Sequence, residues 1–257
     1  NDTSGGNQLF IAGNNTLTGY VPYTRYAVHN QNASAQPDVY ALGNDFGSTV
    51  SSIIESVLYD DTDNAGLSAV VFDSATPTVT EVWVDDDWAT LGLGTAVDPD
   101  GAGPIGSQTI GETAFGYIQQ GIDGVTAPAG GQGIVHVAAG NYVAVDRALA
   151  IVDKPILLEG AGQLGDDTAA TILAGGAYGA GQDATGLGTA WTRGIVVQSD
   201  HVTIENLRVE NFLGDQVVVG GYGIVARAGA SWGVSEATLD DLIVQDVTFV
   251  DCYIGIR

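Results

Sequence analysis

The sequence predicts an all-β chain in which short parallel strands stack into a solenoid, and three observations lead to this prediction. Glycine is abundant at 37 residues while proline stands at 7, a balance that favours many short strands joined by tight turns. The 257 residues are 45% hydrophobic, which is enough to form a buried core. The third observation is an internal repeat in the second half of the sequence.

The repeat lays residues 202–212 over residues 242–252. Apolar residues coincide at alternate positions, so the inward side chains of successive coils would stack on one another. The exceptions are two pairs of polar residues that suit tight corners, Asn206 with Asp246 and Asn211 with Asp251. A single coil cannot bury its apolar face, and the coils must therefore stack.

Other strands are expected on both sides of this repeat. A Gly-Ile pair follows each repeated segment, at Gly223-Ile224 and at Gly255-Ile256, and predicts a further strand in the same coil. Apolar runs at residues 133–138 and 156–160 predict earlier strands.

One short helix is expected near residues 113–125. Its apolar stripe, at helical spacing, consists of Phe115, Ile118, Ile122 and Val125. Such a stripe would close the open N-terminal end of a solenoid. Pro128 and the glycines that follow it predict the end of the helix.

In this order of elements the chain resembles the pectin-lyase-like right-handed parallel β-helix proteins, and more narrowly the large bacterial and archaeal surface proteins that contain such helices. The resemblance is carried by residues 82–88, 114–123, 133–142 and 154–162, which match an entry strand, a capping helix and the first coils. It covers residues 81–257 and implies a right-handed parallel β-helix with a short N-terminal capping helix. It implies little about chemistry.

Residues 1–80 are similar to the way such surface β-helices end. Residues 41–47 match the turn of a last coil, residues 53–61 a short covering helix with an aspartate-rich loop, and residues 67–73 a closing strand. We therefore divide the chain into an end-of-helix segment, 1–80, and a start-of-helix segment, 81–257. The chain is expected to begin inside one β-helix and to stop inside another.

Unpaired coils are then expected at both ends of the chain, where free N–H and C=O groups would be a template for pairing. The expected contact residues are Leu9, Ile11, Leu17 and Tyr20 at one end and Phe249, Cys252, Ile254 and Ile256 at the other. This arrangement fits either a unit of a tandem β-helix array or copies of the chain stacked head to tail in a filament. A third arrangement folds residues 1–80 back onto the same solenoid.

The formal charge of −24, from 31 acidic and 7 basic residues, makes nucleic acid and anionic lipid surfaces poor partners and cations better ones. No run approaches the ~20 apolar residues that cross a bilayer, so no membrane insertion is expected. One cysteine excludes a disulfide within the chain. We expect an extracellular or cell-surface protein, with sequons for glycosylation at Asn14 and Asn32.

Aspartate clusters are the clearest chemical signal. They comprise Asp60, Asp61 and Asp63, then Asp85, Asp86 and Asp87, and finally Asp98 and Asp100. Hard oxygen ligands on glycine-containing loops suit calcium, which is the cofactor that we expect. No cluster completes an EF-hand loop, and solvated acidic turns are the alternative interpretation.

The sequence favours a non-enzymatic structural building block whose ends or loops join neighbouring molecules. The alternative is a β-helix that binds or cleaves extracellular polysaccharide. Lyases on this fold combine calcium-binding acids with a basic residue, and the candidate bases are Lys154, Arg193, Arg208 and Arg227. None of these can be placed against an acidic cluster. The three histidines, His29, His136 and His201, show no metal-binding spacing.

Overall fold

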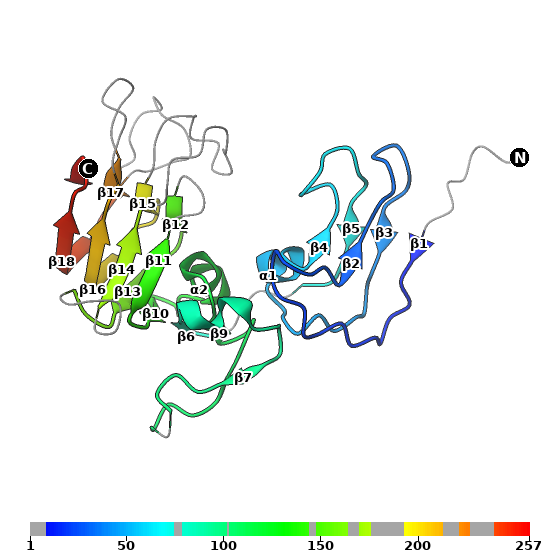
Figure 1. Cartoon of the computed structure of the whole chain (residues 1–257), viewed down its shortest axis with the longest axis horizontal. Helices are drawn as coiled ribbons and strands as arrows, with labels where there is room; N and C mark the ends of the chain where they lie inside the picture. Colours follow the sequence, from blue (N-terminus) through cyan, green and yellow to red (C-terminus); the bar gives the residue numbers. More distant parts are fainter. Residues whose placement is uncertain are drawn as a thin grey trace, which may run out of the picture. The chain divides into compact units, whose positions relative to one another are not determined.

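The computed structural model describes residues 9–74, 79–101, 103–143, 148–163, 170–175, 193–212, 221–226 and 239–257. Figure 1 labels the helices and strands of the chain, which divides into two compact units. Unit 1 comprises Asn1–Pro77 and Trp88–Gly116, and unit 2 comprises Thr78–Asp87 and Tyr117–Arg257. The sequence did not indicate that residues 88–116 belong with unit 1.

Unit 1 holds short strands and one short helix. Its elements are β1 (Leu9–Phe10), β2 (Val28–His29), β3 (Val39–Tyr40), α1 (Ser51–Glu55), β4 (Leu58–Tyr59), β5 (Val70–Val71), β7 (Ala96–Val97), β8 (Gln108–Thr109) and β9 (Ala114–Phe115). The order β1-β3-β5 forms one parallel sheet and β2 pairs with β4 in another, whereas β7 and β8 are antiparallel. A 3-10 helix, η1 (Asp86–Thr90), spans the boundary between the two units.

Successive strands of unit 1 recur at a nearly constant spacing. Hydrogen bonds join Asn15 to Asn44, Gly43 to Asp73, and Asp38 to Ala69, at separations of 29 to 31 residues. Strand β5 lies within residues 67–73, where a strand was expected. The short helix expected within residues 53–61 is α1, which begins at Ser51 and ends at Glu55. It ends there because the backbone on either side of Leu58 bonds to that of residues 27 and 30 and continues as β4.

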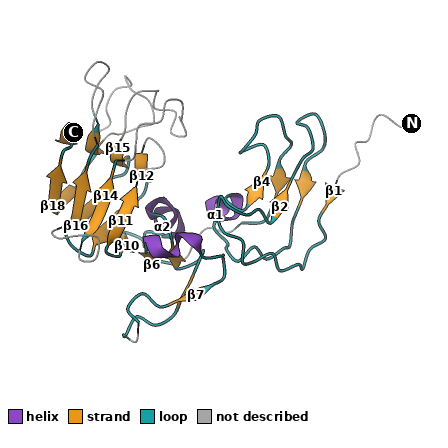
Figure 2. Cartoon of the chain, in the orientation of Figure 1, coloured by secondary structure: helices purple, strands orange, loops and turns teal. Residues whose placement is uncertain are grey.

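Unit 2 is built mostly from parallel strands, as Figure 2 shows. Its elements are β6 (Glu81–Val84), α2 (Ile118–Gly124), β10 (Gly133–Val137), β11 (Gly140–Val143), β12 (Ala148–Val152), β13 (Ile156–Gly160), β14 (Thr171–Ala174), β15 (Arg193–Val197), β16 (Val202–Glu210), β17 (Tyr222–Ala226), β18 (Leu242–Val250) and β19 (Ile254–Ile256). One sheet includes the order β11-β14-β16-β13-β10-β6, with β18 paired to β16, and another has the order β12-β15-β17-β19. The expectation of a mostly β chain with parallel strands is confirmed.

The predicted repeat is confirmed over residues 202–205 and 207–210. Val202 pairs with Leu242 and the register continues to Glu210 with Val250, while Ile224 pairs with Ile256 in the other sheet. The four polar exceptions occupy left-handed backbone, with φ of 58° at Asn206, 60° at Asn211, 50° at Asp246 and 48° at Asp251. Asn and Asp tolerate this conformation better than other side-chain-bearing residues, and they form corners for that reason.

The corner at Asn206 also sets which residues face the core. Along β16 the fully buried residues are Val202, Ile204, Leu207 and Val209. Simple alternation would bury position 206 instead of 207, and the extra left-handed residue shifts the pattern by one position. The apolar residues of both halves of the strand therefore face the same interior.

Helix α2 begins later than the sequence pattern predicts. It runs from Ile118 to Gly124, not over 113–125, and Phe115 lies in β9 instead of on its stripe. Tyr117 is extended, and at Gly116 a Cβ atom would lie 2.4 Å from the Cα of Ala89, so the chain there is held close to another backbone segment. Ile118 and Ile122 are buried, as expected. Neither described α-helix has the length and apolar character that a membrane crossing requires.

Candidate functional site

One end of unit 2 is covered by α2. At Gly121 a Cβ atom would lie 2.5 Å from Val84 Cγ2, so only glycine lets the helix approach β6 this closely. The Gln119 side chain accepts a hydrogen bond from Ile151 N at 2.7 Å and donates to Ile151 O at 3.3 Å, which satisfies the outer edge of β12. Lys154 Nζ donates to the carbonyl oxygens of Asp123 and Val125 at the C-terminal end of the helix.

The opposite end of unit 2 is formed by β18 and β19, which we call the last tier, and β16 and β17 form the preceding tier (Figure 1). Inward positions of β16 are fully buried, whereas their register partners in β18, including Leu242, Val244 and Phe249, are only half-buried. Ile243, Tyr253 and Ile256 are 48%, 58% and 48% exposed. The last tier therefore has the same apolar interior as the tier before it, but less cover.

The outer edges of β18 and β19 have no strand partner among the described residues. A free parallel edge leaves alternate N–H and C=O groups available to another strand. Phe249 packs over Gly223 and Gly255, where a Cβ atom would lie within 2.8 and 3.2 Å of its ring. The Phe249 ring thus packs against these two glycines, while the side chain as a whole remains partly exposed.

The expected contact residues fall into two groups. Phe249, Cys252 and Ile254 are half-buried in the last tier and Ile256 is exposed there. Burial raises the pKa of the Cys252 thiol, which lies near Val209 O and Val250 O. A neutral, half-buried thiol is a packing group and not a nucleophile.

The other group lies in unit 1. Leu9 in the edge strand β1 is 53% exposed, while Ile11, Leu17 and Tyr20 are half-buried. Left-handed residues flank Leu17, with φ of 66° at Asn14 and 80° at Gly19. Their spacing of five residues equals that of Asp246 and Asp251 in the last tier, so both segments turn corners at matching intervals.

Asp85, Asp86 and Asp87 are the only acidic group in the described part of the chain that brings one ligand atom from each of three residues within 4.8 Å of one another. Asp86 Oδ2 accepts a hydrogen bond from Asn141 N at 3.1 Å, and a Cβ atom at Gly140 would collide with its carboxylate. Burial raises the pKa of Asp85, and Asp87 and Asp86 add to the shift. Carboxylate oxygens collected in this way are ligands suited to calcium.

The other predicted aspartates stabilise turns. Asp60 is 2% exposed and accepts backbone hydrogen bonds from Thr62 at 3.0 Å and Val70 at 2.6 Å, whereas Asp61 and Asp63 are exposed. Burial, together with Asp60, raises the pKa of nearby Glu55 to about 7. Asp98 and Asp100 are exposed, and they accept backbone hydrogen bonds within their own loop.

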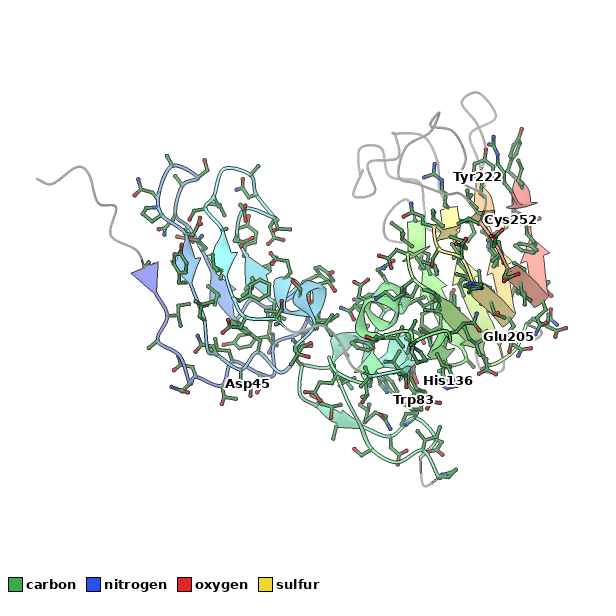
Figure 3. The ribbon with its side chains drawn as sticks, turned by 180° about the vertical axis from the view of Figure 1, so that it is seen from behind. Asp45, Trp83, His136, Glu205, Tyr222 and Cys252 are labelled. Carbon is green, nitrogen blue, oxygen red and sulfur yellow. The ribbon has the colours of Figure 1, made fainter. Side chains whose placement is uncertain are left out.

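A cluster around His136 is the feature that sequence reasoning missed. His136 Nε2 lies 2.8 Å from Glu81 Oε1, and Nδ1 lies 3.0 Å from Glu159 Oε2. The Trp83 ring stacks on the imidazole with centroids 5.4 Å apart and an interplanar angle of 25°. Figure 3 labels Trp83 and His136 beside each other. Pairing the predicted strands 133–138 and 156–160 would have placed His136 opposite Glu159.

The structure gives the candidate bases different surroundings. Lys154 binds the end of α2, Arg193 is fully buried, and Arg208 Nε lies 2.6 Å from Glu210 Oε2. Arg227 lies outside the described residues. Of the asparagines expected to carry glycosylation, Asn14 is exposed and Asn32 is half-buried.

Comparisons with family models, with curated proteins and with solved structures found no match for this chain.

Proposed function

We propose that this protein is a structural, extracellular building block whose unit 2 is a right-handed parallel β-helix and whose last tier is covered by a second copy of the chain. The observation that carries the proposal is the contrast in burial between successive tiers. Leu207 and Val209 are fully buried, while Val247 and Phe249, their register partners in β18, are only half-buried. A further coil placed on β18 would bury these side chains and pair the free edge.

The covering coil is proposed to come from unit 1 of the second copy, in a head-to-tail arrangement. Its edge strand β1 exposes Leu9, and its corners at Asn14 and Gly19 match the spacing of Asp246 and Asp251. Heterologous contacts of this kind extend into filaments when the rotation between copies does not close a ring. The same surfaces would join successive modules of a tandem array.

Calcium is proposed to stabilise the assembly at Asp85, Asp86 and Asp87. The charge of −24 opposes association of copies, and a bound cation reduces that repulsion locally. The three carboxylates offer hard oxygen ligands that lie within 4.8 Å of one another. Asp87 is exposed and would be the first of them to meet an ion from solvent.

The experiment is to follow assembly by sedimentation velocity and electron microscopy for the wild type and two variants of neighbouring residues. Val244→Lys places a charge on the inward side of the last tier, while Ile243→Lys places it on the adjacent outward position. We expect concentration-dependent fibres from the wild type and from Ile243→Lys, and none from Val244→Lys that has retained its circular dichroism. A wild type that stays monomeric, or equal assembly of both variants, would refute head-to-tail stacking.

Binding or cleavage of extracellular polysaccharide is the second candidate function. The observation in its favour is an aromatic ring, Trp83, beside the carboxylates of Glu81 and Glu159, because sugars stack on aromatic rings and donate hydrogen bonds to carboxylates. Release of unsaturated sugars from polyuronates, lost on Trp83→Ala, would favour this function over the structural one.

A further inference from the structure

The His136 cluster has a hydrogen-bonding requirement that depends on a proton. A carboxylate only accepts hydrogen bonds, whereas a neutral imidazole has one donor nitrogen and one acceptor nitrogen. His136 nevertheless places both ring nitrogens at hydrogen-bonding distance from carboxylates, Glu81 at 2.8 Å and Glu159 at 3.0 Å. The contact between Nε2 and Glu81 is a hydrogen bond, and the contact between Nδ1 and Glu159 is an attraction only when Nδ1 also carries a hydrogen, as in the protonated imidazolium.

The groups around the His136 imidazole are acidic or aromatic. Glu81 and Trp83 face the imidazole from β6 and Glu159 faces it from β13, while Glu205 on β16 is the register partner of Glu159 one strand further on. These groups are acids or an aromatic ring, and the face of an aromatic ring attracts a cation. The side chains are partly shielded, with exposures of 30% for His136 and 36% for Glu159.

We propose that His136 is a proton-operated clamp that ties β6, β10 and β13 together when its imidazole carries two protons and releases one glutamate when it carries one. In register, β10 lies between the other two strands, with His136 opposite Trp83 on one side and Glu159 on the other. One bound proton therefore links three strands that come from distant parts of the sequence. Losing that proton leaves a neutral ring facing two carboxylates.

The clamp makes the covered end of unit 2 more stable in mildly acidic than in mildly alkaline solution. The folded state gains by holding the second proton, because that proton turns the contact between Nδ1 and Glu159 into an attraction. Self-repulsion of the acidic chain has the same sign, so the measured quantity is the difference between variants and wild type.

The test measures thermal unfolding midpoints of the full chain from pH 5 to pH 8.5 for four variants. His136→Gln removes the proton, and we expect its midpoint to vary less with pH than that of the wild type. Glu159→Gln gives the Nδ1 atom of a neutral ring an amide donor, so at pH 8 this variant should melt several degrees above the wild type. His201→Gln and Glu205→Gln are the matched controls, since they remove another histidine and another carboxylate from the same unit.

The outcomes distinguish a clamp at His136 from general repulsion between the acidic groups of the chain. Equal pH dependence of wild type and His136→Gln would overturn the proposal, as would equal stabilisation of Glu159→Gln and Glu205→Gln at pH 8. A second readout follows the imidazole proton resonances by NMR, assigned with the histidine variants. The midpoint of the His136 resonance should fall in Glu159→Gln while that of His201 stays constant, and an unmoved His136 midpoint contradicts the clamp.

Discussion

The two ends of unit 2 are finished in opposite ways although both consist of sheet edges. At one end α2 fills the interior, Gln119 bonds both backbone groups of Ile151, and Lys154 caps the helix. At the other end Val247 and Phe249 are only half-buried and no described strand pairs with the outer edge of β18. The difference shows that the apolar repeat alone does not bury the side chains of its last tier, because the apolar side chains of each tier are buried by the neighbouring tier or by a cap.

The largest expected effect on the free energy of unfolding comes from replacing one glycine at each end of unit 2 with a larger residue. Gly121→Val would force a side chain into Val84 at the covered end and should reduce the free energy of unfolding by about 3 kcal/mol. Gly255→Ala meets only the ring of Phe249 at 3.2 Å, and that ring has open space on its outer side. We expect the second change to cost less than about 1 kcal/mol.

Urea unfolding of both variants, followed by circular dichroism, measures this difference. Similar losses at the two positions would mean that the last tier is as tightly enclosed as the end beneath α2, and the comparison between the two ends would no longer hold.

Parts of this comparison were predictable from sequence. Residues 202–212 and 242–252 predict their own register because a stacked coil must present equivalent side chains, and Asn206 and Asn211 mark the corners. The start of α2 was not predictable, since the close approach at Gly116 depends on Ala89, which lies 27 positions earlier in the 3-10 helix η1. Helical spacing at Phe115 therefore gave the wrong element.

The acidic clusters show the same limit. Asp60 and Asp85 both belong to aspartate runs, yet Asp60 accepts backbone hydrogen bonds from Thr62 and Val70 through both of its oxygens, whereas Asp85 accepts one from Asp87 and lies next to two other carboxylates. Which oxygens remain available depends on backbone N–H groups that the fold brings in. Composition and local spacing carry no information about them.

A smaller effect is expected from calcium, which should stabilise the covered end through Asp85, Asp86 and Asp87. At tenfold excess over its dissociation constant, the ion should add about 1.4 kcal/mol to the free energy of unfolding. Asp87→Asn should abolish the increase and leave the hydrogen bond between Asp86 and Asn141 intact. Asp98→Asn, in an exposed loop, is the control.

Calorimetric unfolding with calcium and with a chelator checks this expectation. An equal response of the Asp87 and Asp98 variants would show that the ion acts on the total charge and not at the three-carboxylate cluster.

Hydrogen exchange compares the two ends most directly. If a second copy covers the last tier, amides of β18 should become more protected as the protein concentration rises, while those of β12 beneath α2 should exchange at a constant slow rate. The account predicts this divergence within one molecule. Exchange of β18 amides that is independent of concentration, at concentrations up to those used for microscopy, would contradict it.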